Sequence, residues 1–160
     1  MSSATAATTK SLVIVITGAS RGLGAGMAKT FLEKGHKLGL CSRSTDVTSA
    51  VWYDANNNNN GNIYYESVDV CNSNALQDFL QTVVAKFGRP IDLWINNAGI
   101  LGPIQPIRDT NYDEYNKNIQ INLGGVFHGT KAFINHVRST TSSSERKDAT
   151  LGKIIMCVCV

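Results

Sequence analysis

The chain has 160 residues, of which 42% are hydrophobic and 17% charged, a composition that fits one globular domain with a sizeable core. Its net charge is only +3, and the 15 basic residues are scattered among 12 acidic ones, so we expect no nucleic-acid partner. No apolar run approaches the roughly 18 residues of a membrane span, so we expect no membrane insertion either.

The chain opens with a segment, 1–9, that is rich in Ser, Ala and Thr. It lacks the hydrophobic stretch of a secretory signal, and we expect a disordered arm. Strand-like apolar runs then recur along the chain, with helical patterns in several of the gaps between them. These runs cover 12–17, 37–42, 63–70, 91–95 and 153–160. Such alternation predicts a doubly wound α/β fold around a parallel sheet.

Apolar side chains at helical spacing predict the helices. Met27 and Phe31 lie on one face of a first helix that ends before Gly35. A second helix repeats the pattern from Leu76 to Phe87, with Asn72 or Ser73 as its N-cap. A long helical region spans 112–138. These helices are expected to pack on the sheet.

Two polar stretches interrupt this pattern. In 45–62, a weak helix through Val51 and Trp52 is expected to lead into an exposed loop that contains five consecutive asparagines. The second stretch, 139–150, is also expected to form a loop.

A glycine-rich turn follows the first apolar run and carries the most informative pattern in the chain. Gly18, Gly22 and Gly24 surround Ser20, Arg21 and Leu23 at the point where a strand feeds a helix. Glycines let the backbone turn sharply and approach a pyrophosphate, which amides at the start of a helix stabilise. The turn therefore predicts a nucleotide-phosphate site, although a structural turn alone would use the same residues.

The second predicted strand ends in Cys41-Ser42-Arg43, where a dinucleotide fold usually carries an acid for the ribose 2′-hydroxyl. Arg43 and Arg21 instead supply two cations, and guanidinium groups match phosphate oxygens. This arrangement favours NADP over NAD, unless both arginines are merely solvated.

Two further motifs follow later strands. Asp69-Val70 comes after the third strand, where the carboxylate is expected to accept from an adenine amino group or to cap the next helix. Asn96-Asn97-Ala98-Gly99 ends the fourth strand. Small residues such as Ala98 and Gly99 let the chain pass close to a ribose, and the amide of Asn96 or Asn97 can tie adjacent strand ends together. By itself, this run is also typical of a turn.

The four cysteines lie in apolar or strand-like contexts and lack metal-ligand spacing. We expect reduced thiols in an intracellular protein and no metal site. Cys157 and Cys159 would point to one face of a strand and offer only two ligands.

Together with Ile121-Asn122-Leu123-Gly124-Gly125, these motifs resemble the short-chain dehydrogenase/reductase family over about residues 10–160. The resemblance implies a Rossmann fold with strand order 3-2-1-4-5, a nicotinamide cofactor, and hydride transfer to or from a small carbonyl or alcohol substrate. It matches Asn122 to the asparagine of a catalytic proton relay. A cytoplasmic location and a homo-oligomer formed through the helix 112–138 are further expectations.

One departure from the family pattern is serious. The family's catalytic Tyr-x-x-x-Lys is absent, because none of the five tyrosines has a lysine four residues later. The family's serine falls near Cys159. We therefore expect 10–160 to be an incomplete NAD(P)-binding Rossmann domain, truncated after strand five and inactive alone. A non-catalytic NADP-binding module and a nonfunctional fragment are the alternatives.

Overall fold

A computed structural model describes residues 10–53, 61–141 and 152–156. The arm 1–9, the asparagine run 56–60 and the cysteines 157 and 159 lie outside the described residues, as does most of the second polar stretch. The expectations stated for these segments therefore remain predictions, except that 139–141, predicted to begin a loop, form the last residues of a helix that ends at Thr141.

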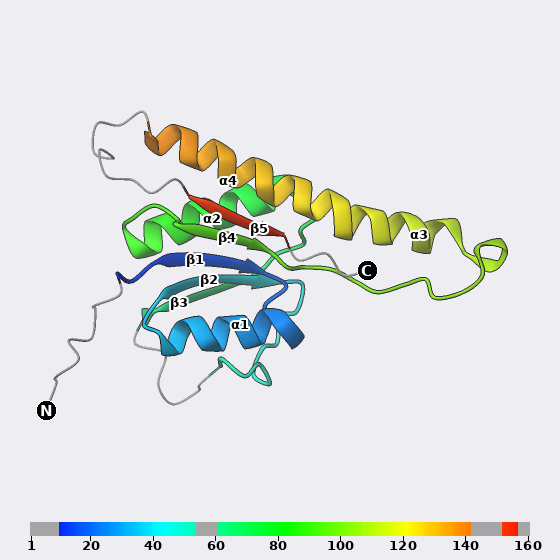
Figure 1. The fold of residues 1–160 in the computed structure, drawn as a ribbon, viewed down its shortest axis with the longest axis horizontal. Coiled ribbons are helices and arrows are strands. Elements are labelled where there is room, and N and C mark those ends of the chain that lie inside the picture. The colour runs from blue at the N-terminus through cyan, green and yellow to red at the C-terminus, as the bar shows by residue number, and fades with distance from the viewer. Residues whose placement is uncertain (1–9, 54–60, 142–151, 157–160) are drawn as a thin grey trace, which may run out of the picture.

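A five-stranded parallel sheet forms the centre of the fold, in the order β3-β2-β1-β4-β5 (Figure 1). Its strands are β1 (Val13–Thr17), β2 (Lys37–Ser42), β3 (Ile63–Ser67), β4 (Leu93–Asn96) and β5 (Lys153–Met156). The structure thus confirms the predicted strand order. The third strand is shorter than the predicted 63–70, because the chain turns away from the sheet after Ser67 and the motif Asp69-Val70 lies in the turn.

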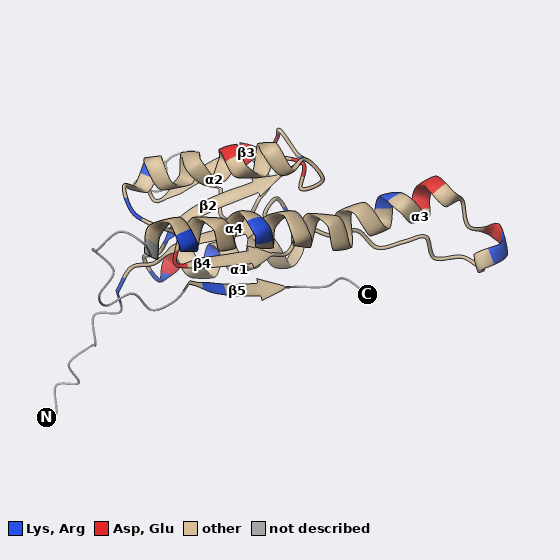
Figure 2. Cartoon of the chain, turned by 90° about the horizontal axis from the view of Figure 1, so that it is seen from above, with Lys and Arg blue, Asp and Glu red and all other residues tan. Residues whose placement is uncertain are grey.

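Helices cover both faces of the sheet. α1 (Gly22–Glu33) lies on one face, whereas α2 (Ser73–Phe87) and α4 (Gly125–Thr141) lie on the other (Figure 1). A short 3-10 turn η2 (Ile107–Asp109), the helix α3 (Tyr112–Ile119) and a π-helical turn η3 (Gln120–Gly124) precede α4. From above, α3, η3 and α4 form one long rod that projects beyond the sheet (Figure 2).

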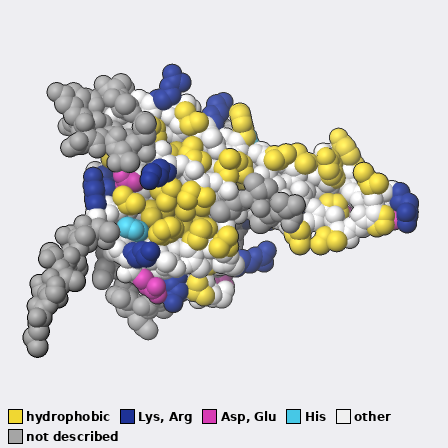
Figure 3. All heavy atoms as spheres, in the orientation of Figure 1, with side chains coloured by type: hydrophobic (Ala, Val, Ile, Leu, Met, Phe, Trp, Pro, Cys, Tyr) yellow, Lys and Arg dark blue, Asp and Glu magenta, His cyan; other side chains and the backbone are white. Residues whose placement is uncertain are grey.

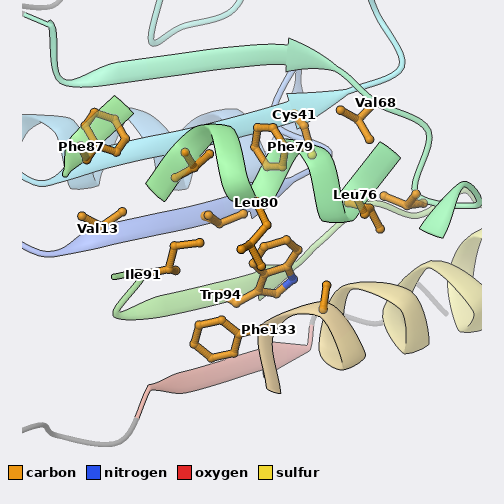
Figure 4. Close-up of a cluster of buried hydrophobic side chains, with 14 of the residues drawn as sticks. Val13, Cys41, Val68, Leu76, Phe79, Leu80, Phe87, Ile91, Trp94 and Phe133 are labelled. Atoms are coloured by element: carbon orange, nitrogen blue, oxygen red, sulfur yellow. The ribbon is translucent and has the colours of Figure 1, made fainter. Parts of the chain in front are cut away.

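The period of two in a strand decides which residue reaches which core. Val13 and Val15 of β1 belong to the cluster under α2 and α4, whereas Ile14 and Ile16 belong to the cluster under α1. Figure 4 shows the first cluster, in which Phe79 and Leu80 of α2, Trp94 of β4 and Phe133 of α4 meet above the sheet. All four side chains are buried. The apolar run of β1 before Thr17 is therefore explained by cores on both sides of the strand.

The helix ends follow the predicted residues. Gly35 has a positive φ of 78° just beyond α1, which is a conformation that glycine adopts at low cost. Of the two predicted caps for α2, Asn72 is the one used, because its side chain accepts hydrogen bonds from the amides of Asn74 and Ala75.

The segment after β2 corrects one prediction. Residues 48–52 form turns and not a helix, and the side chains of Ala50 and Trp52 are buried in the cluster under α1. Their packing against Ala19 and Ala25 outweighs the polar composition of the surrounding stretch. This part of the predicted exposed loop is therefore core.

Candidate functional site: a cavity at the carboxyl ends of the strands

The glycine turn connects β1 to α1 in the conformation that the sequence predicts. Gly18 and Gly22 have positive φ angles of 69° and 57°, where side chains are strained. Gly24 is required for a different reason, because a Cβ on this residue would lie 2.3 Å from the carbonyl oxygen of Gly18. Arg21 is the extended N-cap residue of α1 and makes no side-chain capping bond. The first amides of α1 are thus not capped by this side chain and can face an anion.

Hydrogen bonds tie the end of β1 to the end of β4. The hydroxyl Oγ1 of Thr17 accepts from the amides of Asn97 and Ala98 at 3.1 and 3.0 Å. In return, the side-chain Nδ2 of Asn97 donates to the carbonyl oxygens of Thr17 and Gly18 at 3.0 and 3.1 Å. This contact confirms the prediction that an asparagine amide joins adjacent strand ends.

A cavity of about 540 Å³ lies at this end of the sheet. It collects residues from four segments: the glycine turn, the end of β2, the turn after β3 and the loop after β4. In folds of this kind, a dinucleotide binds in the crevice outside the carboxyl ends of the strands. The lining residues are Gly18, Ser20, Arg21, Leu23, Gly24, Ser42, Arg43, Ser44, Val68, Val70, Asn97, Ala98, Gly99, Ile100 and Ile121.

Nine of the predicted site residues line this cavity, and four do not. Gly22 lies in the same turn but is not a lining residue, and the other three are Asp69, Asn96 and Asn122. Six lining residues were not predicted as site residues: Ser42, Ser44, Val68, Asn97, Ile100 and Ile121. Ser42 and Ser44 flank Arg43 directly in the sequence. Their hydroxyl groups beside a predicted phosphate-binding arginine were the feature from which these two residues could have been predicted.

Arg21 and Arg43 both line the cavity and are both exposed. In the part of the chain that the structure describes, neither guanidinium forms an ion pair. The carbonyl oxygen of Arg43 accepts a hydrogen bond from the hydroxyl of Ser67 at 3.3 Å, which holds the end of β2 against β3. Two guanidinium groups without acidic partners at one cavity are suited to an anionic ligand.

Tyr65 of β3 supports the backbone on both sides of Arg43. Its hydroxyl lies 2.7 Å from the Ser42 hydroxyl and also donates to the carbonyl oxygen of Ser44. Burial raises the pKa of the Tyr65 phenol, the hydrogen bond from Ser42 opposes that shift, and Cys41 adds to it. The phenol therefore stays protonated at neutral pH and available as a donor.

Asn96 and Asp69 lie beside the cavity with side chains that are already engaged. Asn96 is only 2% exposed, accepts from the indole of Trp94 at 2.9 Å and donates to the hydroxyl of Thr130 at 3.1 Å. The carboxylate of Asp69 accepts from the amide of Cys71 at 2.9 Å, so it closes a turn and does not cap α2.

Asn122 lies on the π-helical turn η3 and not within a regular α-helix. Its side chain accepts from the amide of Ile100 and donates to the carbonyl oxygen of the same residue, both at 2.9 Å. A π turn is rare and often marks a functional position. The amide of Asn122 thus holds the loop after β4, which forms one wall of the cavity.

Among the described residues, no group of three His, Cys, Asp or Glu side chains lies close enough together to hold a metal ion. Cys41 and Cys71 are free thiols, and burial raises the pKa of both. No helix among the described ranges is long and apolar enough to cross a membrane.

The strand order, the glycine turn and the cavity at the strand ends define a Rossmann-type dinucleotide-binding fold. The family model described as short chain dehydrogenase matches residues 12–156. The chain therefore belongs to the short-chain dehydrogenase family of oxidoreductases.

Individual relatives agree with this assignment. The chain is 30% identical over 126 residues to L-fucose dehydrogenase of Oryctolagus cuniculus, which covers 79% of the chain and 42% of that protein. It is 27% identical over 121 residues to NADPH-dependent pterin aldehyde reductase of Arabidopsis thaliana, covering 76% of the chain and 49% of the relative. The chain thus spans less than half the length of these two curated relatives.

A solved structure is similar over the same region. The alcohol dehydrogenase from Thermococcus sibiricus complexed with 5-hydroxy-NADP superimposes with a TM-score of 0.71 at 30% identity. The match covers 82% of this chain and 55% of that protein.

Proposed function

We propose that the cavity binds NADP(H) and that the protein is an NADP-dependent short-chain oxidoreductase. Its reaction would transfer a hydride between the cofactor and a small carbonyl or alcohol substrate. The observation that carries the proposal is the pair Arg21 and Arg43, which line one cavity without acidic partners among the described residues. A 2′-phosphate is the group that distinguishes NADP from NAD and would satisfy both cations.

Each segment around the cavity has a role in this proposal. The glycine turn and the first amides of α1 hold the pyrophosphate, while Arg21, Arg43 and the flanking hydroxyls of Ser42 and Ser44 hold the 2′-phosphate. Val68 and Val70 contact the adenine ring. Ala98 and Gly99 allow the chain to pass close to a ribose, and their lack of bulk is what this role requires.

Three predicted site residues, Asp69, Asn96 and Asn122, already use their side chains in hydrogen bonds within the protein. Their proposed roles take these bonds into account. For Asp69, the carboxylate oxygen that does not accept from Cys71 is proposed to accept from the adenine amino group. For Asn96, the ribose contact is assigned to the backbone, because both ends of its amide are occupied. The relay role of Asn122 stays a prediction, since its side chain holds Ile100.

Two relatives support the choice of NADP through their names. The Arabidopsis thaliana relative is named an NADPH-dependent reductase, and the Thermococcus sibiricus structure contains 5-hydroxy-NADP. The nicotinamide of a bound cofactor supplies the hydride, and the residues of this chain bind and orient it.

We further propose that the 160-residue chain binds the cofactor but does not catalyse turnover of substrate. None of its five tyrosines has a lysine four residues later, so the proton donor expected for the family is missing from this sequence. Turnover of NADPH with a ketone panel by the purified chain would contradict this proposal.

We also propose three broader properties of the protein. Residues 10–160 form one nucleotide-binding unit, the protein is cytoplasmic, and copies associate through the rod α3–α4. The outer face of that rod supports association, because Tyr115, Ile119, Leu123 and Phe127 recur at every fourth position and are all exposed.

Replacing Arg43 by aspartate tests the cofactor assignment. Because Arg43→Asp removes a cation and adds an anion at the proposed 2′-phosphate site, NADPH affinity should fall by about tenfold to a hundredfold. NADH affinity, measured in the same fluorescence titration, should change little. The matched control is Arg108→Asp, since Arg108 lies in η2 and does not line the cavity. An unchanged preference for NADPH in Arg43→Asp would refute the assignment.

A further inference from the structure

Trp52 links the glycine turn to the segment that follows β2. Its side chain is 4% exposed and packs in the core cluster under α1. The indole Nε1 donates a hydrogen bond of 2.6 Å to the carbonyl oxygen of Ala19. Ala19 immediately precedes Ser20 and Arg21, so the indole is bonded to the peptide that leads into the proposed phosphate-binding residues.

The ring of Trp52 also contacts the residue that holds Arg43. The rings of Trp52 and Tyr65 lie with centroids 5.6 Å apart. The Tyr65 hydroxyl bonds to the side chain of Ser42 and the carbonyl oxygen of Ser44, on either side of Arg43. A continuous chain of contacts therefore runs from the two residues that flank Arg43 through Tyr65 and Trp52 to Ala19.

We infer that Trp52 is a positioning residue for cofactor specificity, which sets the glycine turn and the end of β2 at the separation where Arg21 and Arg43 act on one phosphate monoester. This inference rests on the proposed NADP-binding function.

The physical reason lies in how the two cations are held. Both arginine side chains are long and exposed, so their positions depend on the backbone from which they extend. The indole hydrogen bond fixes the Ala19 carbonyl and polarises the peptide that carries the Ser20 amide. If the indole donor is lost, both arginines and the hydrogen bond from the Ala19 amide to the Cys41 carbonyl oxygen remain, but the Ala19 carbonyl that leads into Arg21 is no longer held. The 2′-phosphate, which needs both, should lose more binding than the parts shared with NADH.

Trp52→Phe is the direct test, because it keeps an aromatic ring in the core and removes the donor. We expect the ratio of NADH to NADPH dissociation constants to fall by about threefold to tenfold. Trp94→Phe is the matched control. Trp94 is also buried and donates its indole hydrogen at 2.9 Å, but to Asn96, which is not a lining residue and whose proposed ribose contact is common to NADPH and NADH. A purely structural role of tryptophan would lower stability in both variants without changing the ratio.

A second pair of variants keeps the test informative if Trp52→Phe does not fold. Tyr65→Phe removes the hydroxyl that holds Ser42 and Ser44, and should also lower the ratio. Tyr64→Phe is its control, because the neighbouring hydroxyl donates to Glu66 at 2.8 Å and its ring packs on Phe79 of α2. Tyr64 thus lies on the other face of β3 and should leave the ratio unchanged.

Hydrogen exchange adds a measurement that needs no nucleotide. Amides of 18–24 should exchange faster in Trp52→Phe than in Trp94→Phe, because only the first loses the bond to the turn. Equal exchange, or a ratio that Trp52→Phe and Tyr65→Phe both leave unchanged, would overturn the role of Trp52 alone. A wild-type chain that binds NADPH and NADH equally would instead overturn the proposed NADP function, and the specificity role with it.

Discussion

At the scale of single residues, glycines that look equivalent in the sequence have different tasks. Gly24 and Gly26 both lie in α1, but a Cβ on Gly24 would meet the Gly18 carbonyl oxygen at 2.3 Å and the Asn97 side chain at 2.5 Å. A Cβ on Gly26 would meet nothing within 4 Å. Gly24 is thus required for packing of α1 against the strand ends, whereas Gly26 is not.

Alanine at these two positions should have opposite effects. In Gly24→Ala, the new Cβ would push the start of α1 away from the Gly18 carbonyl oxygen at the cavity. This should lower the free energy of unfolding by about 1–3 kcal/mol. It should also weaken nucleotide binding. Gly26→Ala should raise stability by up to about 1 kcal/mol, because alanine is the better helix former. Urea unfolding of both variants checks this, and a Gly24→Ala protein as stable as the wild type would show that the clash is relieved.

His36 makes stability depend on pH. Its Nδ1 accepts a hydrogen bond from the Leu12 amide at 3.2 Å, which requires an unprotonated nitrogen. Burial, with a smaller contribution from Lys34, lowers the pKa of His36 below its ordinary value. The unfolded chain therefore binds the proton at higher pH than the folded chain does. Stability from this group is present above the ordinary histidine pKa of about 6.5 and is lost as the pH falls.

His36→Gln isolates that effect. Glutamine keeps an acceptor for the Leu12 amide but does not titrate, so the loss of stability between about pH 7.5 and about pH 5.5 should be smaller than in the wild type. The comparison is made from the urea midpoints of both proteins at the two pH values. Because His128 and His136 are present in both proteins, a difference between them is due to position 36. An equal loss in both would assign the pH dependence to other groups.

At the scale of elements, the π turn joins the long rod to the cavity wall. The amide of Asn122 satisfies both backbone groups of Ile100, and the Asn118 side chain adds bonds to the carbonyl oxygens of Ile100 and Gly102. The loop after β4 is therefore held by η3 and the end of α3. Displacement of the rod would move the wall formed by Gly99 and Ile100.

Asn122→Ala should release this loop. The partly buried amide of Ile100 loses its partner, and the Ile100 carbonyl oxygen keeps only the longer bond from Asn118, which should lower the free energy of unfolding by about 1–3 kcal/mol. Nucleotide affinity should fall with it for NADPH and NADH alike. Asn135→Ala on the exposed surface of α4 is the control. If Asn122→Ala unfolds and binds like the control, the loop does not depend on this amide.

At the scale of the whole molecule, much apolar surface is uncovered. Figure 3 shows hydrophobic side chains along the projecting arm, and β5 is the last strand on its side of the described sheet. Ile155 and Met156 of β5 are exposed. The exposed residues at 115, 119, 123 and 127 add a stripe along the rod. Surfaces of this kind normally contact another part of a protein or a partner.

The chain should therefore bind an apolar-surface dye and self-associate. Replacing Leu123 and Phe127 together by glutamine should weaken self-association by at least about tenfold in sedimentation velocity, because two large apolar groups leave the contact. Leu101 and Ile107, also replaced by glutamine, serve as the control for general loss of exposed apolar surface. A monomeric wild-type chain with a cooperative melt and no dye binding would contradict the prediction.

Local patterns were sufficient for the framework of this protein. The alternation of apolar residues predicted the strands, their order followed from the family resemblance, and the glycines predicted the turn between β1 and α1. The strands and the turn depend on neighbours within a few positions, where the periods of strand and helix apply. Nine of the thirteen predicted site residues line the cavity. They do so because each follows a predicted strand, and the carboxyl ends of parallel strands meet at one edge of the sheet.

The partners of individual polar groups depended on contacts between distant segments. Asn97 bonds to Thr17 across 80 positions, and Trp52 reaches Ala19 across 33. The composition around Trp52 predicted an exposed loop, whereas the side chain of Trp52 is buried in the structure. Which side chain of Asn96 and Asn97 faces the cavity was likewise decided by packing of β4 against β1 and α4. The sequence by itself determined the class of fold and the edge that carries the site. Tertiary structure alone decided which groups are free to meet a ligand, because a hydrogen bond is satisfied by whatever the folded chain brings beside it.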